Sequence, residues 1–294
     1  MERIFAQMDS GRPGPLVIII AALHGNEKVG LQATAAFFER FSAKEINGKV
    51  VVLVGNVAAA EQQCRFIDHD LNRFFISQYL NEPHSGVSEW HEARQLIDAV
   101  EEQVLLYPQA TKRYILDMHS MSGEGIPFTC FPNSQQNDAL ARRIYLPAIA
   151  GIVEFLPGTL AEYFNRHFDS ILVAECGQHD APKTLDNGVA ILIHYLHLID
   201  VLQSSACHRE AKQVLMHNTQ GYWDVFTRVR YRYHIENRTH FEMQPGFSNL
   251  QKVCQETLLA RDGSHLIYAP FDARIVLPCY QKQGDDGFFL AVDE

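Results

Sequence analysis

The sequence LVIIIAALHGNEKVG, residues 16–30, indicates both the fold class and the position of a site. Its first part, Leu16–Leu23, is a nearly continuous aliphatic run, which is typical of a strand buried on both faces of a parallel sheet. The run is too short to span a bilayer. It ends in HGNE, so His24 and Glu27 follow directly after a buried strand, and Gly25 allows a tight turn between them.

Apolar runs of strand length alternate with segments of helical periodicity through the first two-thirds of the chain. The expected strands after the first are residues 49–56, 113–120 and 170–177. The expected helices are residues 30–43, 88–106, 138–153 and 188–202. This alternation predicts an α/β fold with a mixed, mostly parallel sheet that helices cover on both faces.

The pattern changes after about residue 205. Short alternating runs such as DVFTRVRYRYHI and HLIYAPFDARIVLP are separated by turn dipeptides, including Pro-Gly and Asp-Gly. Such runs are typical of antiparallel strands joined by tight turns. We therefore expect two domains, an α/β domain over residues 1–205 and a small C-terminal β domain over residues 206–294.

Composition and charge narrow the class of protein. The chain has 294 residues, of which 47% are hydrophobic, enough for a substantial core. Its formal net charge of −10 disfavours nucleic acid and anionic membranes as partners. The six cysteines show no C-x-x-C spacing, and MERIFAQMDS does not have the form of a signal peptide. These features predict reduced thiols and a cytoplasmic protein.

Reactive side chains follow the ends of several expected strands, where ligands bind in open α/β sheets. His24 and Glu27 follow the first strand, Asp117 and His119 end the third and Glu175 ends the fourth. Each alone is more often a structural residue. Together, two imidazoles and one carboxylate match the ligands of a hydrolytic zinc site, which keeps one position open for water. Glu175 is the candidate base for that water.

Two neighbouring motifs leave alternatives open. Cys176 and His179 could form a cysteine–histidine nucleophile, although adjacent residues of a strand point to opposite faces. The sequence RFIDHDLNR, residues 65–73, could be a salt-bridged surface loop or an anion-binding segment. In the second case one arginine binds a substrate carboxylate and the other stabilises an oxyanion. The DHD triplet could hold a metal, but an orienting role for its carboxylates is preferred.

Four motifs carry a resemblance to a known family. They are HGNE at 24–27, RFIDHDLNR at 65–73, LDMHS at 116–120 and AECG at 174–177. In this order they resemble the succinylglutamate desuccinylase/aspartoacylase family of zinc amidohydrolases, which are related in fold to zinc carboxypeptidases. QPGFSNLQKV and YAPFDARIVLPCYQKQ are similar to its C-terminal β domain. The resemblance implies a zinc-carboxypeptidase-like α/β fold.

The resemblance also implies residue roles. The implied zinc ligands are His24, Glu27 and His119, and Glu175 is the implied general acid and base. Arg65 would polarise the scissile carbonyl, while Asn72 and Arg73 would hold the α-carboxylate of the substrate. Further substrate contacts are implied for Tyr163, Arg166 and Tyr280. The chain departs from the family after Glu175, because no proline follows Gly177, and it also departs in SMSGEG after His119.

These observations predict a hydrolase that binds one zinc ion per chain. We expect it to cleave the amide bond of a small-molecule N-acyl amino acid, of the N-acyl aspartate or glutamate type, with a zinc-activated water. The alternatives are a metallopeptidase of the carboxypeptidase type and a non-catalytic protein that binds a metal or a carboxylate. No nucleic-acid or membrane partner is expected, and the sequence leaves homo-oligomerisation open.

Overall fold

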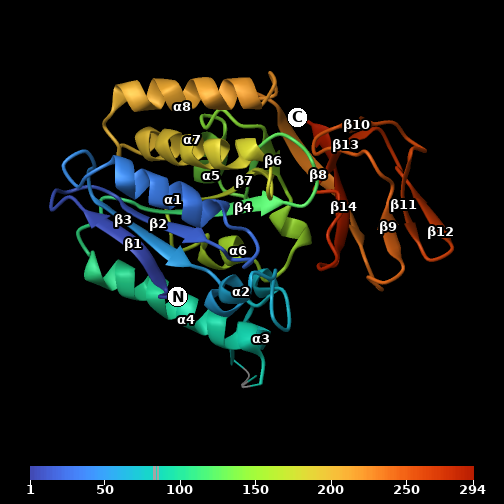
Figure 1. The fold of residues 1–294 in the computed structure, drawn as a ribbon, viewed down its shortest axis with the longest axis horizontal. Helices are drawn as coiled ribbons and strands as arrows, with labels where there is room; N and C mark the ends of the chain where they lie inside the picture. Colours follow the sequence, from blue (N-terminus) through green and yellow to red (C-terminus); the bar gives the residue numbers. More distant parts are fainter. Residues whose placement is uncertain (82–83, 85) are drawn as a thin grey trace.

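The computed structural model describes residues 1–81, 84 and 86–294. Its main feature is an 11-stranded sheet with the order β1-β3-β2-β4-β7-β5-β6-β8-β14-β13-β10 (Figure 1). The strands of this sheet are β1 (Ile4–Asp9), β2 (Leu16–Ala21), β3 (Lys49–Val54), β4 (Arg113–Met121), β5 (Phe128–Phe131), β6 (Ala148–Ala150), β7 (Ser170–Gln178), β8 (Phe226–His234), β10 (Lys252–Val253), β13 (Ala273–Val276) and β14 (Asp286–Asp293). The remaining strands, β9 (Phe241–Met243), β11 (Leu258–Asp262) and β12 (His265–Tyr268), form a second sheet.

The centre of the large sheet is parallel. Strand β2 pairs in parallel with β3 and β4, and β4 pairs in parallel with β7. Every residue of β2 and β3 is buried, as their continuous aliphatic sequences predict. Strands β1 and β5 run antiparallel to β3 and β7, so the sheet is mixed. The mixed, mostly parallel sheet is therefore confirmed.

Helices cover both faces of this sheet (Figure 1). One face packs against α1 (Val29–Arg40), α5 (Gln135–Ala141), α7 (Pro182–Leu198) and α8 (Ser205–Asn218). The other packs against α4 (Ser88–Leu106) and α6 (Leu160–Phe164), with the 3-10 turns η1 (Leu71–Arg73) and η2 (Val153–Phe155) beside them. Two short helices, α2 (Val57–Gln62) and α3 (Ser77–Asn81), complete the set. Alternate residues of β2 enter the two cores, which explains why the strand has no polar face.

The structure corrects one expected helix. Residues 138–153 were expected to be helical, but α5 ends at Ala141 and residues 148–150 form strand β6. Pro147 lacks a backbone N–H and disfavours helical geometry in the residue before it. Strand β6 lies between β5 and β8 and pairs in parallel with both. Helix α8 is a further difference, because the sequence did not predict a helix there.

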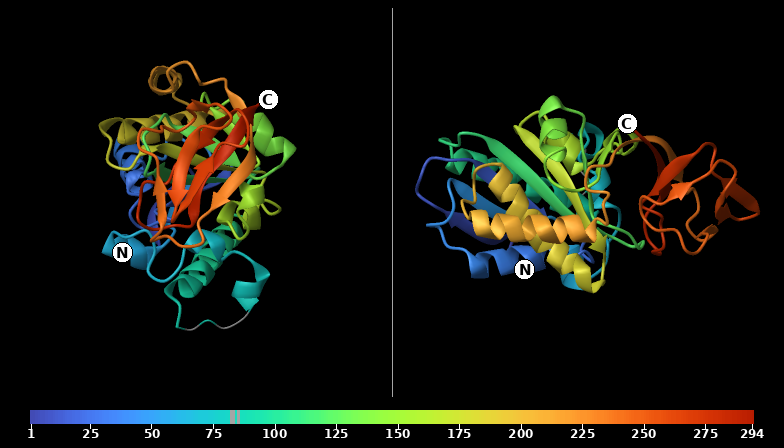
Figure 2. Two further views of the ribbon diagram at one scale, coloured as in Figure 1. Left: turned by 90° about the vertical axis from the view of Figure 1, so that its right-hand side faces the viewer. Right: turned by 90° about the horizontal axis from the view of Figure 1, so that it is seen from above.

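The C-terminal strands form a lobe beside the helix-covered part of the sheet (Figure 2). Its own core contains Phe241, Leu259, Ile275 and Phe288. The division at residues 205 and 206 stays a prediction, since α8 packs with α7 in the first core and β8 pairs with β6.

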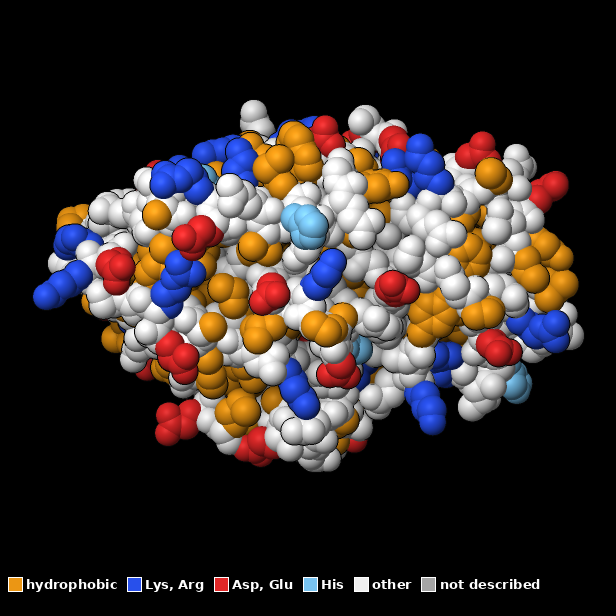
Figure 3. All heavy atoms as spheres, turned by 45° about the horizontal axis from the view of Figure 1, so that its top comes forward, with side chains coloured by type: hydrophobic (Ala, Val, Ile, Leu, Met, Phe, Trp, Pro, Cys, Tyr) orange, Lys and Arg blue, Asp and Glu red, His pale blue; other side chains and the backbone are white. Residues whose placement is uncertain are grey.

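Basic and acidic side chains are interspersed on the face shown in Figure 3. Within the described residues, the helices are too short or too polar to cross a bilayer.

Three histidines stack where α7 meets α8. The ring centroids of His194 and His208 lie 4.8 Å apart, and those of His197 and His208 lie 3.8 Å apart. His194 is completely buried, and this burial lowers its pKa to about 4. The folded protein therefore keeps this imidazole neutral at pH values where an unfolded chain would protonate it.

We expect this histidine to make stability depend on pH. Between about pH 6.5 and pH 4, His194 binds a proton in the unfolded chain but stays neutral in the folded protein, so acidification favours unfolding. Above pH 6.5 His194 does not change the free energy of unfolding, and near pH 4 it lowers that free energy by about 3 kcal/mol. Urea unfolding across this range should give a flatter profile for His194→Gln than for the native chain. The exposed His265→Gln is the matched control, and equal slopes in all three proteins would contradict the expectation.

Candidate active site

The site lies where three parallel strands end. His24 and Glu27 follow β2, His119 is near the end of β4, and Glu175 lies on β7. Strand β4 lies between β2 and β7, and His119 is directly opposite Glu175 in the register. Gly25 is needed between the first two residues because a Cβ there would overlap the backbone carbonyl of Ala59.

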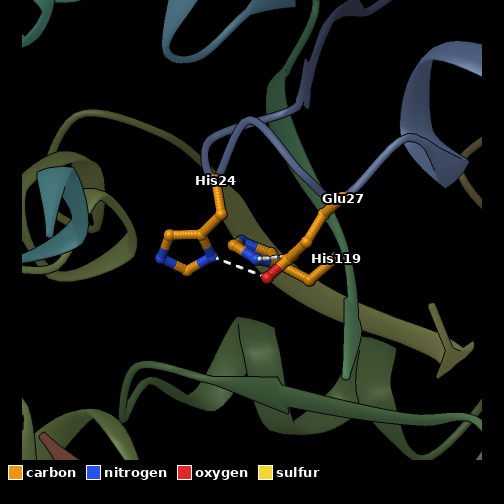
Figure 4. Close-up of side chains that lie close together, drawn as sticks. All are labelled: His24, Glu27 and His119. Carbon is orange, nitrogen blue, oxygen red and sulfur yellow. Dashed lines mark hydrogen bonds and ion pairs between the residues drawn. The ribbon is translucent and has the colours of Figure 1, made fainter. Parts of the chain in front are cut away.

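His24, Glu27 and His119 converge (Figure 4). The Nδ1 atom of His24 lies 2.9 Å from Oε1 of Glu27, and Nδ1 of His119 lies 2.9 Å from Oε2 of the same carboxylate. One ligand atom from each residue lies within 4.8 Å of the others, a group that could hold a metal ion. Two nitrogens and one carboxylate form a donor set that suits zinc and leaves a position open.

A carboxylate stands behind each imidazole. The Nε2 atom of His24 is 3.0 Å from Oδ1 of Asp70, and Nε2 of His119 is 2.9 Å from Oδ2 of Asp117. Metal-ligating histidines commonly use their second nitrogen in this way. The preferred orienting role within DHD thus fits Asp70. Asp68 instead accepts a hydrogen bond from the backbone N–H of Ser88, at the start of α4.

The carboxylates of Glu27, Asp70 and Asp117 favour positive charge on the two imidazoles that lie between them. Burial opposes protonation of His119, but the charges of Asp117 and Glu27 outweigh it and raise the pKa well above its usual value. Burial alone would raise the pKa of Glu27, yet the two imidazoles hold it well below its usual value. A buried site that favours cationic partners so strongly fits a divalent metal ion.

His24, Glu27 and His119 line a cavity, and Glu175 lines it too. Glu175 has the properties of a proton-transfer group. Burial raises the pKa of its carboxyl to about 7, although neighbouring His119 opposes the shift. Its Oε2 atom is buried and has no hydrogen-bond partner among the described residues. A carboxyl group of this kind can accept and release a proton near neutral pH.

Two arginines line the cavity, and both are partly engaged. Arg65 donates from Nη1 to Glu27 over 3.2 Å and from Nη2 to Asp70 over 2.9 Å. Arg73 donates from Nη2 to Asp286 of β14. The Nε atoms of both arginines are buried and lack a partner within the described chain. Each guanidinium therefore has one buried nitrogen, Nε, whose N–H is available to a ligand.

Asn72 lies beside Arg73 in η1. Its Oδ1 atom accepts a hydrogen bond of 2.9 Å from the backbone N–H of Leu160, so its amide nitrogen is the part that could serve a ligand. The structure thus brings seven of the predicted residues to one cavity: His24, Glu27, Arg65, Asn72, Arg73, His119 and Glu175.

Three predicted contacts are not among the residues that line this cavity. Arg166 lines a different cavity with Lys112 and Arg113, at the start of β4. Because β4 and β7 are parallel, the residues just before β7 lie at the opposite edge from Glu175, so the structure places Arg166 away from the cavity that Glu175 lines. The ring of Tyr163 packs against those of Phe75 and Phe164.

The hydroxyl of Tyr280 is committed to the C-terminal lobe. It donates to the carbonyl of Gln244 and accepts from the backbone N–H of Phe247. The residues on either side of Tyr280 line the cavity, but Tyr280 itself does not.

The cysteine–histidine alternative finds no matching geometry. Cys176 is completely buried in the core beneath α7, and burial raises the pKa of its thiol well above its usual value. His179 contacts Ser120 instead, with 2.8 Å between Nδ1 and Oγ. A nucleophilic thiolate requires the reverse conditions, a lowered pKa and an adjacent base.

Sequence reasoning gave no role to two functional candidates, although Asp117 was noted with His119 at the end of the third strand. Asp117 had a usable signal, because residues two apart on a strand share a face and His119 was already selected. Asp286 had none, since it is 213 residues from Arg73 and only the folded chain joins them.

Comparison with known proteins agrees with the motifs. Residues 13–153 match the succinylglutamate desuccinylase/aspartoacylase catalytic domain. A probable aspartoacylase of Acaryochloris marina is 34% identical over 106 residues, covering 35% of this chain and 34% of the relative. A succinylglutamate desuccinylase of Serratia proteamaculans is 26% identical over 165 residues, covering 51% of this chain and 47% of the relative. The matched regions thus span about half or less of the length of these relatives.

Solved structures share the fold at low sequence identity. A succinylglutamate desuccinylase/aspartoacylase from Rhodobacter sphaeroides superposes with a TM-score of 0.71 at 16% identity, covering 96% of this chain and 87% of that one. Murine aminoacylase 3 gives a TM-score of 0.61 at 14% identity, covering 96% of both chains. These likenesses confirm the predicted fold class. In its catalytic-domain match over residues 13–153 and in its fold, the chain is similar to the succinylglutamate desuccinylase/aspartoacylase family.

Proposed function

We propose that this protein is a zinc-dependent hydrolase that cleaves the amide bond of an N-acyl amino acid. The observation that carries the proposal is the convergence of His24, Glu27 and His119 beside Glu175, at the ends of three parallel strands. The names of its relatives, desuccinylase and aspartoacylase, describe removal of an acyl group from an amino acid. The products would be a carboxylate and a free amino acid.

The donor set fits the metal that this chemistry requires. His24, Glu27 and His119 would hold the zinc ion, while Asp70 and Asp117 would orient the two imidazoles. When bound, zinc lowers the pKa of a water molecule to about 7 and polarises a carbonyl group.

Glu175 would move the proton. It accepts one proton from the attacking water as the new C–O bond forms, and donates it to the amide nitrogen as the C–N bond breaks. A pKa of about 7 allows both transfers near neutral pH. Arg65 would donate its buried, unpartnered Nε–H to the carbonyl oxygen as negative charge develops there.

The substrate needs a group that fixes its orientation. Arg73 and Asn72 are neighbours in the chain and both line the cavity, so the unpartnered Nε–H of Arg73 and the amide nitrogen of Asn72 would be the donors to an α-carboxylate. A carboxylate there would place the amide bond toward Arg65 and Glu175.

The shape of the cavity favours a short substrate over a peptide. Seven residues of the C-terminal lobe help to enclose it: Leu277, Pro278, Cys279, Gln281, Gly284, Asp286 and Phe289. Its volume is about 120 Å³, comparable with the roughly 150 Å³ of a cavity that binds benzene. A carboxypeptidase would need a longer cleft. A protein that only binds a ligand would not need a buried carboxyl with the properties of Glu175.

We expect hydrolysis to require zinc and a free carboxylate. The measurement is amine release by metal-free and zinc-reloaded protein from N-formyl, N-acetyl and N-succinyl amino acids. The carboxamide of the best substrate should react with a kcat/KM lower by about 10²-fold, because it leaves buried donors unpaired. Absence of zinc-dependent turnover across the panel would refute the function, and faster cleavage of peptides would favour the carboxypeptidase alternative.

A further inference from the structure

The charges around the cavity limit how many anionic groups a ligand can carry. Of the described residues that line it, the arginines are Arg65 and Arg73, and there is no lysine. Arg65 already faces Glu27 and Asp70, while Arg73 faces Asp286. In each arginine both Nη atoms already donate a hydrogen bond, and the buried Nε is the nitrogen without a partner among the described residues. One donor suits the scissile carbonyl and the other a single carboxylate.

The anionic side chain of Asp286 strengthens this limit. Its Oδ2 atom accepts from Arg73 and its Oδ1 atom accepts from Nε of Arg232 over 2.6 Å, so it is fixed between two guanidinium groups. Asp286 lines the cavity from β14. Asp286 partly neutralises Arg73, the cation that a second substrate carboxylate would need. Its own negative charge also repels that carboxylate.

One part of the wall is apolar, while Ser120, Ser122, Thr159 and Gln281 add uncharged polar groups elsewhere in the lining. Cys130 and Val173 are paired across β5 and β7, and Val173 shares its face of β7 with Glu175. Six residues form what we call the apolar wall: Cys130, Ile152, Val153, Leu156, Val173 and Phe289. Burial raises the pKa of the Cys130 thiol well above its usual value, so this side chain is neutral too. A carboxylate against this wall would lose its hydration without gaining a cation.

Arg232 does not line the cavity and is held by Asp286 and by the carbonyl oxygen of Phe155. Two further cations belong to a separate cavity. Arg238 and Lys282 line that cavity, on the other side of Arg73, and neither lines the first one. Arg238 is occupied by the carbonyl oxygens of Phe241 and Gln281. These side chains therefore do not offset a charge placed against the apolar wall.

Building on the proposed deacylase function, we propose that the substrate carries a single carboxylate and is otherwise uncharged. Its acyl group is a short aliphatic one, and its amino acid has a neutral, apolar side chain. This differs from the N-acyl aspartate or glutamate that the sequence suggested. N-succinyl compounds are excluded for the same reason, because their second carboxylate would face the apolar wall.

Two matched substrate pairs test the proposal. N-acetyl-leucine and N-acetylaspartate differ in the side chain, while N-butyryl-leucine and N-succinyl-leucine differ in the acyl end. With zinc-loaded protein, we expect kcat/KM to favour the monocarboxylate by about 10²-fold or more in each pair, since an unpaired buried charge is costly. Equal or faster turnover of either dicarboxylate would overturn the proposal and leave the deacylase function standing.

A binding measurement separates this proposal from the proposed function. Calorimetry on zinc-loaded Glu175→Gln protein reports affinity for the same four compounds without turnover. Tighter binding of both monocarboxylates supports the proposal even if the native protein hydrolyses none of them, which would refute only the deacylase function. Equal binding, or tighter binding of the dicarboxylates, overturns the proposal.

A pair of variants tests the role given to Asp286. Asp286→Asn removes the fixed anion, so the preference for N-acetyl-leucine over N-acetylaspartate should fall by about 10-fold, the scale of one weakened charge interaction. Asp285→Asn is the matched control, because the adjacent Asp285 is more exposed and lines only the second cavity. It should keep the native preference within about twofold. Identical preferences in the two variants would overturn the charge argument.

Discussion

Replacing Glu175 with glutamine should lower kcat/KM by about 10²- to 10⁴-fold while the protein still binds one zinc ion, because general acid–base groups contribute on this scale. The amide has nearly the volume of the carboxyl but cannot accept the proton of the attacking water. Glu175 is not one of the three converging residues, so the metal-binding set stays intact. The measurements are steady-state kinetics and zinc content on the same preparation.

The pH profile gives this expectation a second readout. Burial raises the pKa of Glu175 to about 7, so the carboxyl is protonated below that pH and cannot act as a base. The kcat/KM of the native protein should fall as pH drops through about 7, and the residual activity of Glu175→Gln should lack that fall. Glu162→Gln, at an exposed glutamate, is the control. Near-native turnover in Glu175→Gln would assign the base to another residue.

The centre of the fold was predictable because its signals are local. Leu16–Leu23 has no polar position, and the observed strand β2 is buried at every residue. Parallel strands bring their carboxyl ends to one edge, so His24, His119 and Glu175 could be expected to meet. Strand β6 was not predictable in the same way, because three apolar residues fit a helix or a strand equally well.

The features of the site that the sequence did not predict also have a physical explanation. Arg166 lies only a few residues before β7, the strand that carries Glu175. Because Glu175 is near the far end of β7, the two residues lie at opposite edges of the sheet. The partner of Arg73 and much of the apolar wall come from distant strands, including β14. Local patterns cannot report such pairings, and the limit proposed for the charge of the substrate depends on them.

Replacing Glu27 with glutamine should have the broadest effect, because four donors depend on this one carboxylate. It accepts from Nδ1 of His24 and of His119, each over 2.9 Å, and from Nη1 of Arg65 and the backbone N–H of Ser120, each over 3.2 Å. Glu27 is only 2% exposed, so water cannot replace the lost carboxylate oxygen as an acceptor. A glutamine offers one acceptor oxygen and turns an NH₂ group toward donors.

We therefore expect Glu27→Gln to bind less than about one-tenth of the native zinc content, since a ligand has been removed from the set of three. The metal-free variant should also unfold with a free energy lower by about 3 kcal/mol, because breaking a buried charge network leaves cationic groups uncompensated. Zinc analysis and urea unfolding of the metal-free proteins measure the two effects separately. Glu39→Gln, at an exposed glutamate of α1, should change neither. Full zinc content in Glu27→Gln would remove this carboxylate from the metal site, and native stability without zinc would contradict its role as the acceptor that holds the two imidazoles together.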